Sequence, residues 1–425
     1  MSLANELIKF IKKSPTAYHT VATVKEALLA RGYTELSEGD VLSFSDGGKH
    51  FVIRGGTSII AFRGSGDGFM VTSSHSDAPA FKVKCELDGG IYARCATESY
   101  GGMIYYTWFD RPLSVAGRVV VSTEDGVASR LVNVDKNALI IPSLAIHMNR
   151  GVNDGYKFNP AVDLLPLAGT LASRGALMQA VAESAGCKVE DIISHDLFLY
   201  NRDEGAIVGI NDELVLSPRL DDLGCVYTSV GAFLKAKSSK NSVSVLAIFD
   251  NEEVGSSTKQ GANSTFLDMT LSAIAGSKAQ YARMLKNSFM VSADNAHAVH
   301  PNHPELADAS NRPKLAEGVV VKYNANQRYT TDALSDGIFR TLAARSGARL
   351  QSYSNRADLP GGSTLGSICN TRVAMPTVDI GLPQLAMHSA CESCAACDLD
   401  DMVKVLCEFY SSSLISDGTD VKIIK

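Results

Sequence analysis

The first residues of the chain carry apolar side chains at helical spacing. Apolar positions over residues 3–11 recur every three or four residues until Ser14-Pro15, which predicts an amphipathic helix that ends there. A second stripe over residues 21–28 predicts another helix, and Gly32 ends it. We expect both helices to pack their apolar faces against a larger core.

Further along, the apolar residues form short continuous runs of strand length. The runs cover residues 69–72, 243–249, 289–292 and 374–380. Only Ser244 interrupts the run 243–249, which is typical of a strand buried on both faces of an α/β sheet. Helical patterns at 225–236 and 333–344 lie between some runs, and this alternation predicts an α/β domain with helices flanking a sheet. The glycine-rich residues 64–68 predict a hairpin loop.

Residues 89–206 have a different pattern. They contain turn signals such as Gly101-Gly102, short strand-like pieces and one helical stretch near residues 175–185. This pattern predicts a separate β-rich domain inserted into the α/β domain. The α/β domain would then be formed by residues 1–88 and 207–425.

Composition and charge narrow the class of protein. Of the 425 residues, 45% are hydrophobic and 20% are charged, as in an ordinary globular protein. The 40 basic and 46 acidic residues give a net charge of −6, which argues against a nucleic-acid-binding surface. No apolar stretch approaches the ~18 residues that a membrane span needs, and the N-terminal residues lack the apolar core of a secretory signal. We therefore expect a cytoplasmic protein that binds neither nucleic acid nor membrane.

The nine cysteines fit this location. Their odd number and scattered positions are unlike the disulfide framework of a small secreted domain. Cys391, Cys394 and Cys397 have a metal-like spacing, but a structural zinc site needs four ligands and Cys407 is distant. Ordinary thiols near a helix start are favoured, with a metal or redox role as the alternative.

Residues suited to chemistry follow the strand-like runs. They are His75 and Asp77, Glu252 and Glu253, Asp294 and His297, and His388, and Asp221 lies between an extended stretch and a helix. Each residue alone is more often structural, since a single histidine is usually solvated, a Glu pair usually forms a solvated turn, and an Asp often caps a helix. In an open α/β sheet, however, ligands bind outside the carboxyl ends of the strands. Their joint placement therefore predicts one site.

This set of side chains favours two metal ions. Imidazole and carboxylate groups suit zinc, and also manganese or cobalt. Two histidines and three or four carboxylates are too many for one tetrahedral ion but suit two ions that share a bridging carboxylate. Such a pair polarises a carbonyl group and lowers the pKa of bound water, and a spare carboxylate beside it can act as general base. Asp77, two residues after His75, is placed to accept the other N–H of that imidazole.

Seven motifs carry a resemblance to a known family. They are SHSDAP, SPRLDD, DNEEVGSS, SADNAHAVHPN, KYNANQRY, GGSTLG and MHS. Together they resemble the aspartyl aminopeptidase family of di-metal metalloaminopeptidases, in the family's order and over nearly the whole chain. The resemblance implies a zinc-peptidase-type mixed sheet flanked by helices, with residues 89–206 as an inserted dimerisation domain. It also implies that the protein removes N-terminal residues from peptides and prefers Asp or Glu.

The resemblance assigns the metal ligands and the base. The implied ligands are His75, Asp221, Glu253, Asp294 and His388. Asp221 would bridge two divalent ions, with His75 and Asp294 completing one site and Glu253 and His388 the other. Zinc is the leading candidate, with cobalt or manganese as alternatives. Glu252 would be the general base.

The resemblance also implies contacts with the peptide substrate. They involve His297, Lys322 and Tyr329, and His147, which a neighbouring subunit would lend to the active site. On the residues alone, Lys322 ends an apolar run and is more often a surface lysine, although it could pair with an acidic substrate side chain. The implied assembly is a homo-oligomer in which dimers build a tetrahedral dodecamer.

The sequence departs from the family pattern at two positions. Asp222 stands where relatives often carry Asn, and Cys391 stands where many carry Arg. Neither change removes a ligand. Asp222 adds a negative charge beside the metals, so both positions bear on metal affinity and substrate preference.

Two alternatives stay open on the sequence. A different di-metal amidohydrolase, such as a deacylase of N-acyl amino acids, could use the same ligands, and cleavage of an N-acetylated peptide would favour it. A non-enzymatic carrier or assembly protein would be expected to have lost at least one ligand, and this chain keeps the whole set.

Overall fold

The computed structural model describes residues 2–39 and 47–425, and their largest sheet is mixed and has nine strands. In spatial order the strands are β1 (Thr34–Leu36), β2 (His50–Arg54), β3 (Ser58–Arg63), β13 (Val243–Phe249), β4 (Phe69–His75), β14 (Phe289–Ala293), β18 (Thr377–Gly381), β16 (Val319–Tyr323) and β17 (Leu350–Ser354). The central strands β13, β4, β14 and β18 are parallel, whereas β3 and β16 pair antiparallel on either side of them.

Helices cover both faces of this sheet. One face packs against α1 (Leu3–Lys13), α2 (Ala17–Leu29), α4 (Leu220–Lys235), α7 (Ala333–Ser346) and α9 (Ala396–Tyr410), and the other against α5 (Phe266–Ala275), α6 (Lys278–Lys286) and α8 (Leu365–Arg372). Successive residues of β13 alternate between the two cores, with Leu246 in the first and Val245 in the second. This double burial explains the continuous apolar run in the sequence. We call this sheet and its helices the nine-stranded region.

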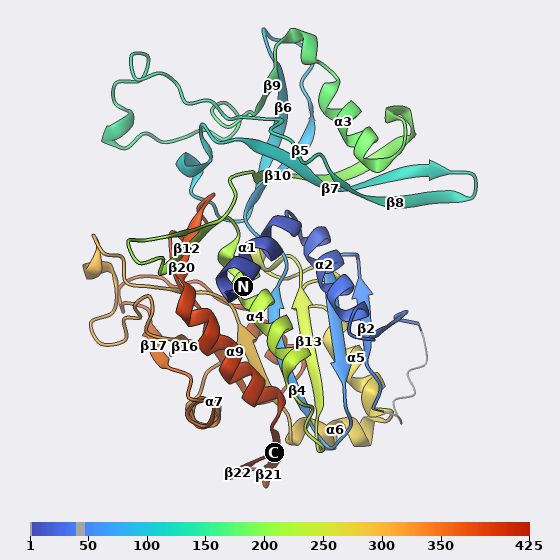
Figure 1. The fold of residues 1–425 in the computed structure, drawn as a ribbon, viewed down its shortest axis with the longest axis vertical. Coiled ribbons are helices and arrows are strands. Elements are labelled where there is room, and N and C mark those ends of the chain that lie inside the picture. Colours follow the sequence, from blue (N-terminus) through green and yellow to red (C-terminus); the bar gives the residue numbers. More distant parts are fainter. Residues whose placement is uncertain (1, 40–46) are drawn as a thin grey trace.

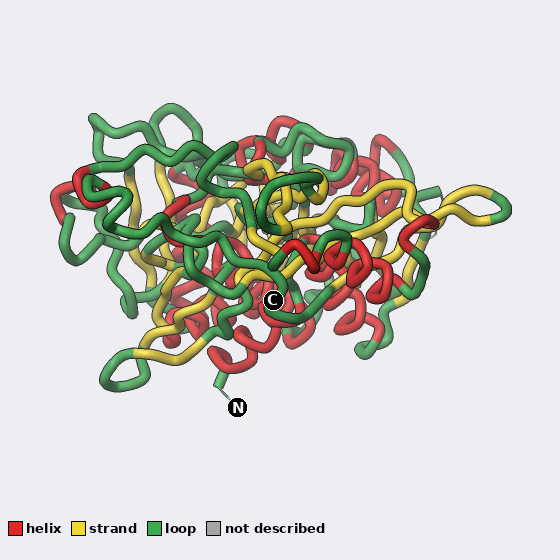
Figure 2. The backbone as a smooth tube through the Cα atoms, turned by 90° about the horizontal axis from the view of Figure 1, so that it is seen from above, coloured by secondary structure: helices red, strands yellow, loops and turns green. Residues whose placement is uncertain are grey.

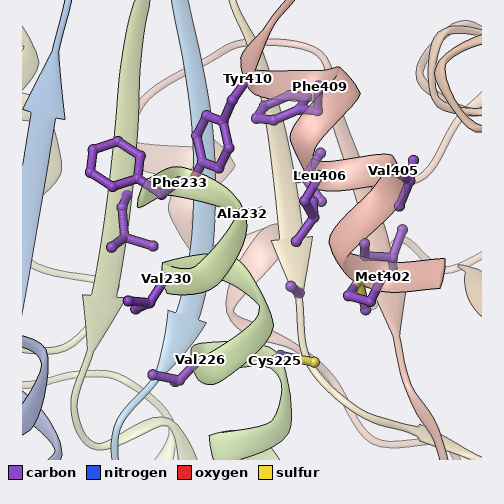
Figure 3. Packing of buried hydrophobic residues seen from close by; sticks show 14 of the residues in the cluster. Cys225, Val226, Val230, Ala232, Phe233, Met402, Val405, Leu406, Phe409 and Tyr410 are labelled. Atoms are coloured by element: carbon purple, nitrogen blue, oxygen red, sulfur yellow. The ribbon is translucent and has the colours of Figure 1, made fainter. Parts of the chain in front are cut away.

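Helices α4 and α9 pack together on the first face (Figure 3). Phe233 of α4 and Tyr410 of α9 meet edge to face with ring centroids 5.3 Å apart, and Leu406 of α9 is fully buried in the same cluster. Burying a side chain of this size contributes ~1.5–3 kcal/mol. Because α4 begins at Leu220, this packing also fixes the segment that carries Asp221.

A second sheet of six strands lies at the other end of the molecule (Figure 1). In spatial order it contains β8 (Gly126–Asn133), β7 (Leu113–Thr123), β10 (Ile192–Asn201), β5 (Ala80–Glu86), β6 (Ala93–Tyr100) and β9 (Leu167–Gly169). Its own core includes Phe81, Trp108 and residues of α3 (Ala176–Ala185). The β7–β8 hairpin projects from the body of the molecule, also in the view from above (Figure 2). We call residues 80–201 the six-stranded region; its first strand, β5, lies ahead of residue 89.

Two smaller sheets complete the fold. One contains β11 (Ala206–Val208), β12 (Leu214–Ser217), β20 (Glu392–Ala395), β19 (Pro383–Leu385) and β15 (Ala296–His297), and the other is the hairpin of β21 (Ser413–Ser416) and β22 (Val421–Ile424). Within the described residues, no helix is long and apolar enough to cross a membrane.

Most of the predicted elements are confirmed, and two predictions need correction. Helices α1 and α2 and strands β4, β13 and β14 lie where the apolar patterns placed them. Strand β18 begins only at Thr377, since Pro376 has no backbone N–H to donate. The hairpin predicted at residues 64–68 is wrong, because β13 lies between β3 and β4 in the sheet.

Candidate metal centre

The predicted chemical residues gather where the parallel strands of the nine-stranded sheet end. His75 is the last residue of β4, Asp294 follows β14, and the Glu252-Glu253 pair follows β13. These strands are parallel neighbours, so their carboxyl ends meet at one edge. Asp221 lies at the start of α4 and His388 between β19 and β20.

Their side chains form two clusters that share Asp221. In the first, ligand atoms of His75, Asp221, Asp222 and Asp294 lie within 4.8 Å of one another, and in the second those of Asp221, Glu253 and His388 do. His75 Nε2 is 3.4 Å from Asp221 Oδ1, and His388 Nε2 is 3.5 Å from Asp221 Oδ2 and 3.4 Å from Glu253 Oε2. Donor atoms bound tetrahedrally to zinc at ~2.0–2.2 Å lie roughly 3.3–3.6 Å apart. The three distances fit this range, and His75 Nε2 is 4.0 Å from Asp294 Oδ1, which is slightly wider than the range.

Burial and neighbouring charges shift the pKa values of these groups. Burial raises the pKa of Glu252 to about 8, against the opposing effect of His75. Burial, together with the charge of Asp221, raises the pKa of Glu253 well above its usual range. Asp221 differs, because His388 and His75 lower its pKa although burial opposes them. Buried carboxylates this close together need added positive charge to stay ionised, and two divalent cations would supply it.

Asp77 lies behind the first cluster and contacts both parts of the site. Its backbone oxygen is 3.1 Å and its Oδ1 3.4 Å from His75 Nδ1, the ring nitrogen that faces away from the cluster. Its carboxylate also accepts hydrogen bonds from the backbone N–H groups of Glu252 and Glu253, both at 3.2 Å. These contacts orient the imidazole and the Glu pair together.

The chain turns at Glu252 and Glu253, directly after β13. Glu252–Val254 form a 3-10 helix, preceded by Asn251 with φ of 62° and followed by Gly255 with φ of 90°. Asparagine and glycine tolerate this left-handed conformation. The turn sends Glu253 into the second cluster and leaves Glu252, half-buried, outside both groups of candidate ligands.

Two acidic residues have larger roles than the sequence indicated. Glu392, on β20, accepts hydrogen bonds from the backbone N–H of Asp221 at 2.9 Å and of His388 at 2.7 Å, and burial raises its pKa to about 8. Asp222 belongs to the first cluster and also accepts a hydrogen bond from the backbone N–H of His75 at 3.2 Å. Glu392 acts through backbone groups, and its place four residues after His388 was the only signal in the sequence.

The predicted substrate residues lie in different surroundings. Lys322 is buried, not at the surface, with Nζ 3.0 Å from the Asn295 backbone oxygen, 3.9 Å from Asp294 Oδ2 and 5.4 Å from the centre of the Tyr329 ring. Tyr329 is buried beside it, and His297 is exposed on β15. His147 is exposed between β8 and β9, outside both clusters.

Of the cysteines, Cys225 lies next to the first cluster, where its thiol contacts Asp222 and donates to Asn295 Oδ1 at 3.0 Å. All nine are free thiols. Cys394 is part of β20, Cys391 precedes that strand and Cys397 is in the first turn of α9, near a helix start as expected. In the part of the chain that the structure describes, the groups able to hold a metal contain no cysteine.

Comparisons with known proteins agree with this geometry. Residues 10–410 match the family described as Aminopeptidase I zinc metalloprotease (M18). The chain is 44% identical to a probable M18 family aminopeptidase 2 of Clostridium acetobutylicum, over 97% of this chain and 99% of the relative. It is 38% identical to a probable M18 family aminopeptidase 2 of Pseudomonas aeruginosa, over 96% and 97% of the two chains.

Solved structures are similar along the same length. The structure of the Ape4 and Nbr1 complex matches with a TM-score of 0.93 and 34% identity, over 96% of this chain and 85% of the other. The S. cerevisiae mApe1 dodecamer matches with a TM-score of 0.82 and 28% identity, over 96% of both chains. These similarities confirm the predicted fold class. The chain therefore belongs to the M18 family of metalloaminopeptidases, hydrolases that remove N-terminal residues from peptides.

Proposed function

We propose that this chain is a two-metal aminopeptidase that releases acidic N-terminal residues. The observation that carries the proposal is the position of Asp221, whose two carboxylate oxygens face His75 in one cluster and His388 in the other. A carboxylate placed in this way can bridge two cations. His75 and Asp294 would complete one site, and Glu253 and His388 the other.

Zinc is the metal we propose for both sites, with cobalt or manganese as alternatives. When bound, two such cations polarise the scissile carbonyl and acidify a water molecule. Glu252 would take a proton from that water on its carboxylate and later deliver it to the nitrogen of the leaving amine. Burial raises the pKa of Glu252 to about 8, and nearby cations would lower it towards neutral pH, where a general base is most effective.

The proposed preference for Asp or Glu rests on Lys322. Its ammonium group is buried next to the first cluster, where it could pair with an acidic side chain in low dielectric surroundings. The hydroxyl of Tyr329 and the ring of His297 would donate hydrogen bonds to the substrate's carboxylate or carbonyl oxygen. Because Lys322 also faces Asp294, it could instead only offset charge at the metal centre, and substitution of this lysine separates the two roles.

We also propose a homo-oligomer in which the inserted domain, residues 89–206, forms the dimer contact. His147 stands in an exposed segment with the apolar side chains of Leu144, Ile146 and Met148, which are 56%, 48% and 75% exposed. Clustered apolar exposure of this kind marks an interaction surface. A neighbouring chain docked there would receive His147, and the mApe1 relative is a dodecamer. The nine free thiols suit the reducing cytoplasm, which we propose as its location.

The test is hydrolysis of a peptide series that differs only in the N-terminal residue (Asp, Glu, Leu, Lys or Ala), after removal of metal and reloading with zinc, cobalt or manganese. We expect the highest kcat/KM for Asp and Glu and no cleavage when the N-terminal amine is acetylated. Cleavage of the acetylated peptide would favour a deacylase instead.

Lys322→Met separates the two roles of that lysine. If it binds substrate, the variant loses its preference for Asp over Leu while zinc content stays at two ions per chain. If it only balances charge, zinc content changes and the ratio of kcat/KM values for Asp and Leu does not. Lys314→Met, at a lysine whose side chain is 64% exposed, is the matched control and should change neither quantity.

A further inference from the structure

The six-stranded region contacts the metal centre through residues 100–107, which begin with the last residue of β6. The backbone N–H of Ile104 donates to the His388 backbone oxygen at 3.1 Å. Thr107 Oγ1 accepts a hydrogen bond from the Ala390 backbone N–H at 2.9 Å. A Cβ atom on Gly101 would lie 3.1 Å from Glu253 Cβ, so the chain passes directly against that ligand candidate. A segment from the other region therefore lies against one side of the second cluster.

Tyr100 makes the corresponding contact behind the first cluster. Its hydroxyl donates a hydrogen bond of 2.6 Å to Asp77 Oδ2 and accepts one of 2.9 Å from Asn251 Nδ2. Its ring packs edge to face on Phe198 of β10, with centroids 5.6 Å apart. The hydroxyl is therefore held on the six-stranded side by ring packing and on the nine-stranded side by two hydrogen bonds.

Asp77 connects the Tyr100 hydroxyl to the candidate ligands, because the same carboxylate contacts both. Of its hydrogen bonds, the one from Tyr100 is the shortest, and the same carboxylate accepts the backbone N–H groups of Glu252 and Glu253. Its Oδ1 is 3.4 Å from His75 Nδ1. A carboxylate that loses its shortest hydrogen bond can rotate, and rotation would release the imidazole and the Glu turn together.

We propose that Tyr100 is a positioning residue that sets the metal affinity of the centre from the six-stranded region. The inference rests on the proposed two-metal site and deepens it, because it makes zinc binding depend on the docking of the two regions. Partners behind metal ligands change metal affinity by about 10–100-fold when removed. We expect Tyr100→Phe to weaken zinc binding within that range, because both His75 and the Glu253 turn depend on Asp77.

The experiment measures zinc dissociation constants of the metal-free full-length chain by competition with a chelating fluorescent dye. Tyr105→Phe is the matched control, since it removes a hydroxyl that meets Ser99 Oγ at 3.1 Å in the same segment without touching the site. Asn251→Gly removes the amide that donates to the Tyr100 hydroxyl, so it tests the same contact from the nine-stranded region. Glycine accepts the φ of 62° at this position, so the backbone can stay unchanged. Circular dichroism and thermal unfolding of the metal-free variants verify that each has folded.

The expected result is weaker zinc binding for Tyr100→Phe, a smaller loss for Asn251→Gly, no further loss in the double variant, and wild-type binding for Tyr105→Phe. Unchanged binding in Tyr100→Phe, or equal losses in both Tyr→Phe variants, would overturn the inference while leaving the two-metal site intact. A wild-type chain that binds no zinc would overturn both. A wild-type chain that binds two zinc ions but cleaves no peptide would defeat the proposed function alone.

Discussion

The two large sheets of this protein differ in what they bury. On β13 of the nine-stranded region all seven residues are buried, whereas most positions of β8 in the six-stranded region are partly or fully exposed. A strand enclosed by helices on both faces cannot shift without disrupting two cores. The residues that follow it are therefore held rigidly, as the side chains of a metal site need to be. A sheet with an exposed face keeps surface for a partner. The two regions therefore differ in how tightly their strands are enclosed and in how much surface they leave open.

The largest effect is expected at the rigid end of the nine-stranded sheet. Glu252→Gln keeps the size of the side chain and removes its ability to take a proton, so kcat should fall by about 10²–10⁴-fold. Zinc content and the thermal unfolding temperature should stay at wild-type values, because Glu252 lies outside both ligand clusters. Steady-state kinetics and metal analysis measure this, with the exposed Glu317→Gln as control. Near-normal turnover would mean that another group is the base.

A pair of valine substitutions compares the packing of the two sheets directly. Val245 of β13 is fully buried, and Val127 of β8 is 69% exposed. Val245→Ala leaves a cavity between two packed layers and should lower the free energy of unfolding by about 2–3 kcal/mol. Val127→Ala should change it by less than about 0.5 kcal/mol. Denaturant unfolding of both variants gives the two values, and equal losses would contradict the contrast.

A charge placed on the exposed apolar segment should separate assembly from stability. Met148→Asp introduces a carboxylate at a position that is 75% exposed beside His147. If this segment is the proposed interface, we expect smaller particles in analytical ultracentrifugation and a lower kcat, because the proposed contribution of His147 to a neighbouring active site would be lost. The unfolding temperature should not change at low protein concentration. Met269→Asp, at a methionine that is 53% exposed on α5 of the nine-stranded region, is the control. Unchanged particle size in Met148→Asp would move the interface elsewhere.

The fold was most predictable where local sequence and burial agree. The run 243–249 matches β13 because a strand between two helical layers must be apolar at nearly every position. The hairpin expected at residues 64–68 failed because β3 pairs with β13, a strand far along the chain, and short-range turn signals carry no information on such pairing. The six-stranded sheet begins at Ala80, ahead of residue 89, because β5 pairs with β6 and β10. Such pairing is not visible in the local sequence.

The candidate site was predictable where residue type and position both point to chemistry. His75 and Asp294 follow apolar runs of strand length, and the rule for open α/β sheets places residues after such strands at one edge. Glu392 and Tyr100 were not predictable, because they act on backbone groups or across the two regions. Nothing in the sequence around Tyr100 or Glu392 indicates which distant groups their side chains contact.

The smallest expected effect concerns Asp196, which forms ion pairs within the six-stranded region and also contacts α2. Asp196 accepts hydrogen bonds from Arg118 at 2.8 Å, from Lys82 at 2.9 Å and from Tyr18 of α2 at 3.1 Å. Although burial opposes it, Arg118 and Lys82 lower the pKa of Asp196 to about 2. A carboxyl whose pKa is lower in the folded state stabilises the fold above its unfolded pKa of ~4, and that stability is lost as the pH falls towards 2.

Asp196→Asn should therefore lower the free energy of unfolding by about 1–2 kcal/mol at pH 7, and its difference from the wild type should shrink between pH 4 and pH 2. Denaturant unfolding of the two chains across this pH range measures it, with the exposed Asp125→Asn at the tip of the β7–β8 hairpin as a control that should show no difference at any pH. A difference that does not vary with pH would mean that Asp196 stabilises the fold through its hydrogen bonds and that its charge contributes nothing. The contact between α2 and the six-stranded region would then rest on the Tyr18 hydroxyl and on the Arg118 guanidinium, which lies 4.8 Å from the centre of the Tyr18 ring.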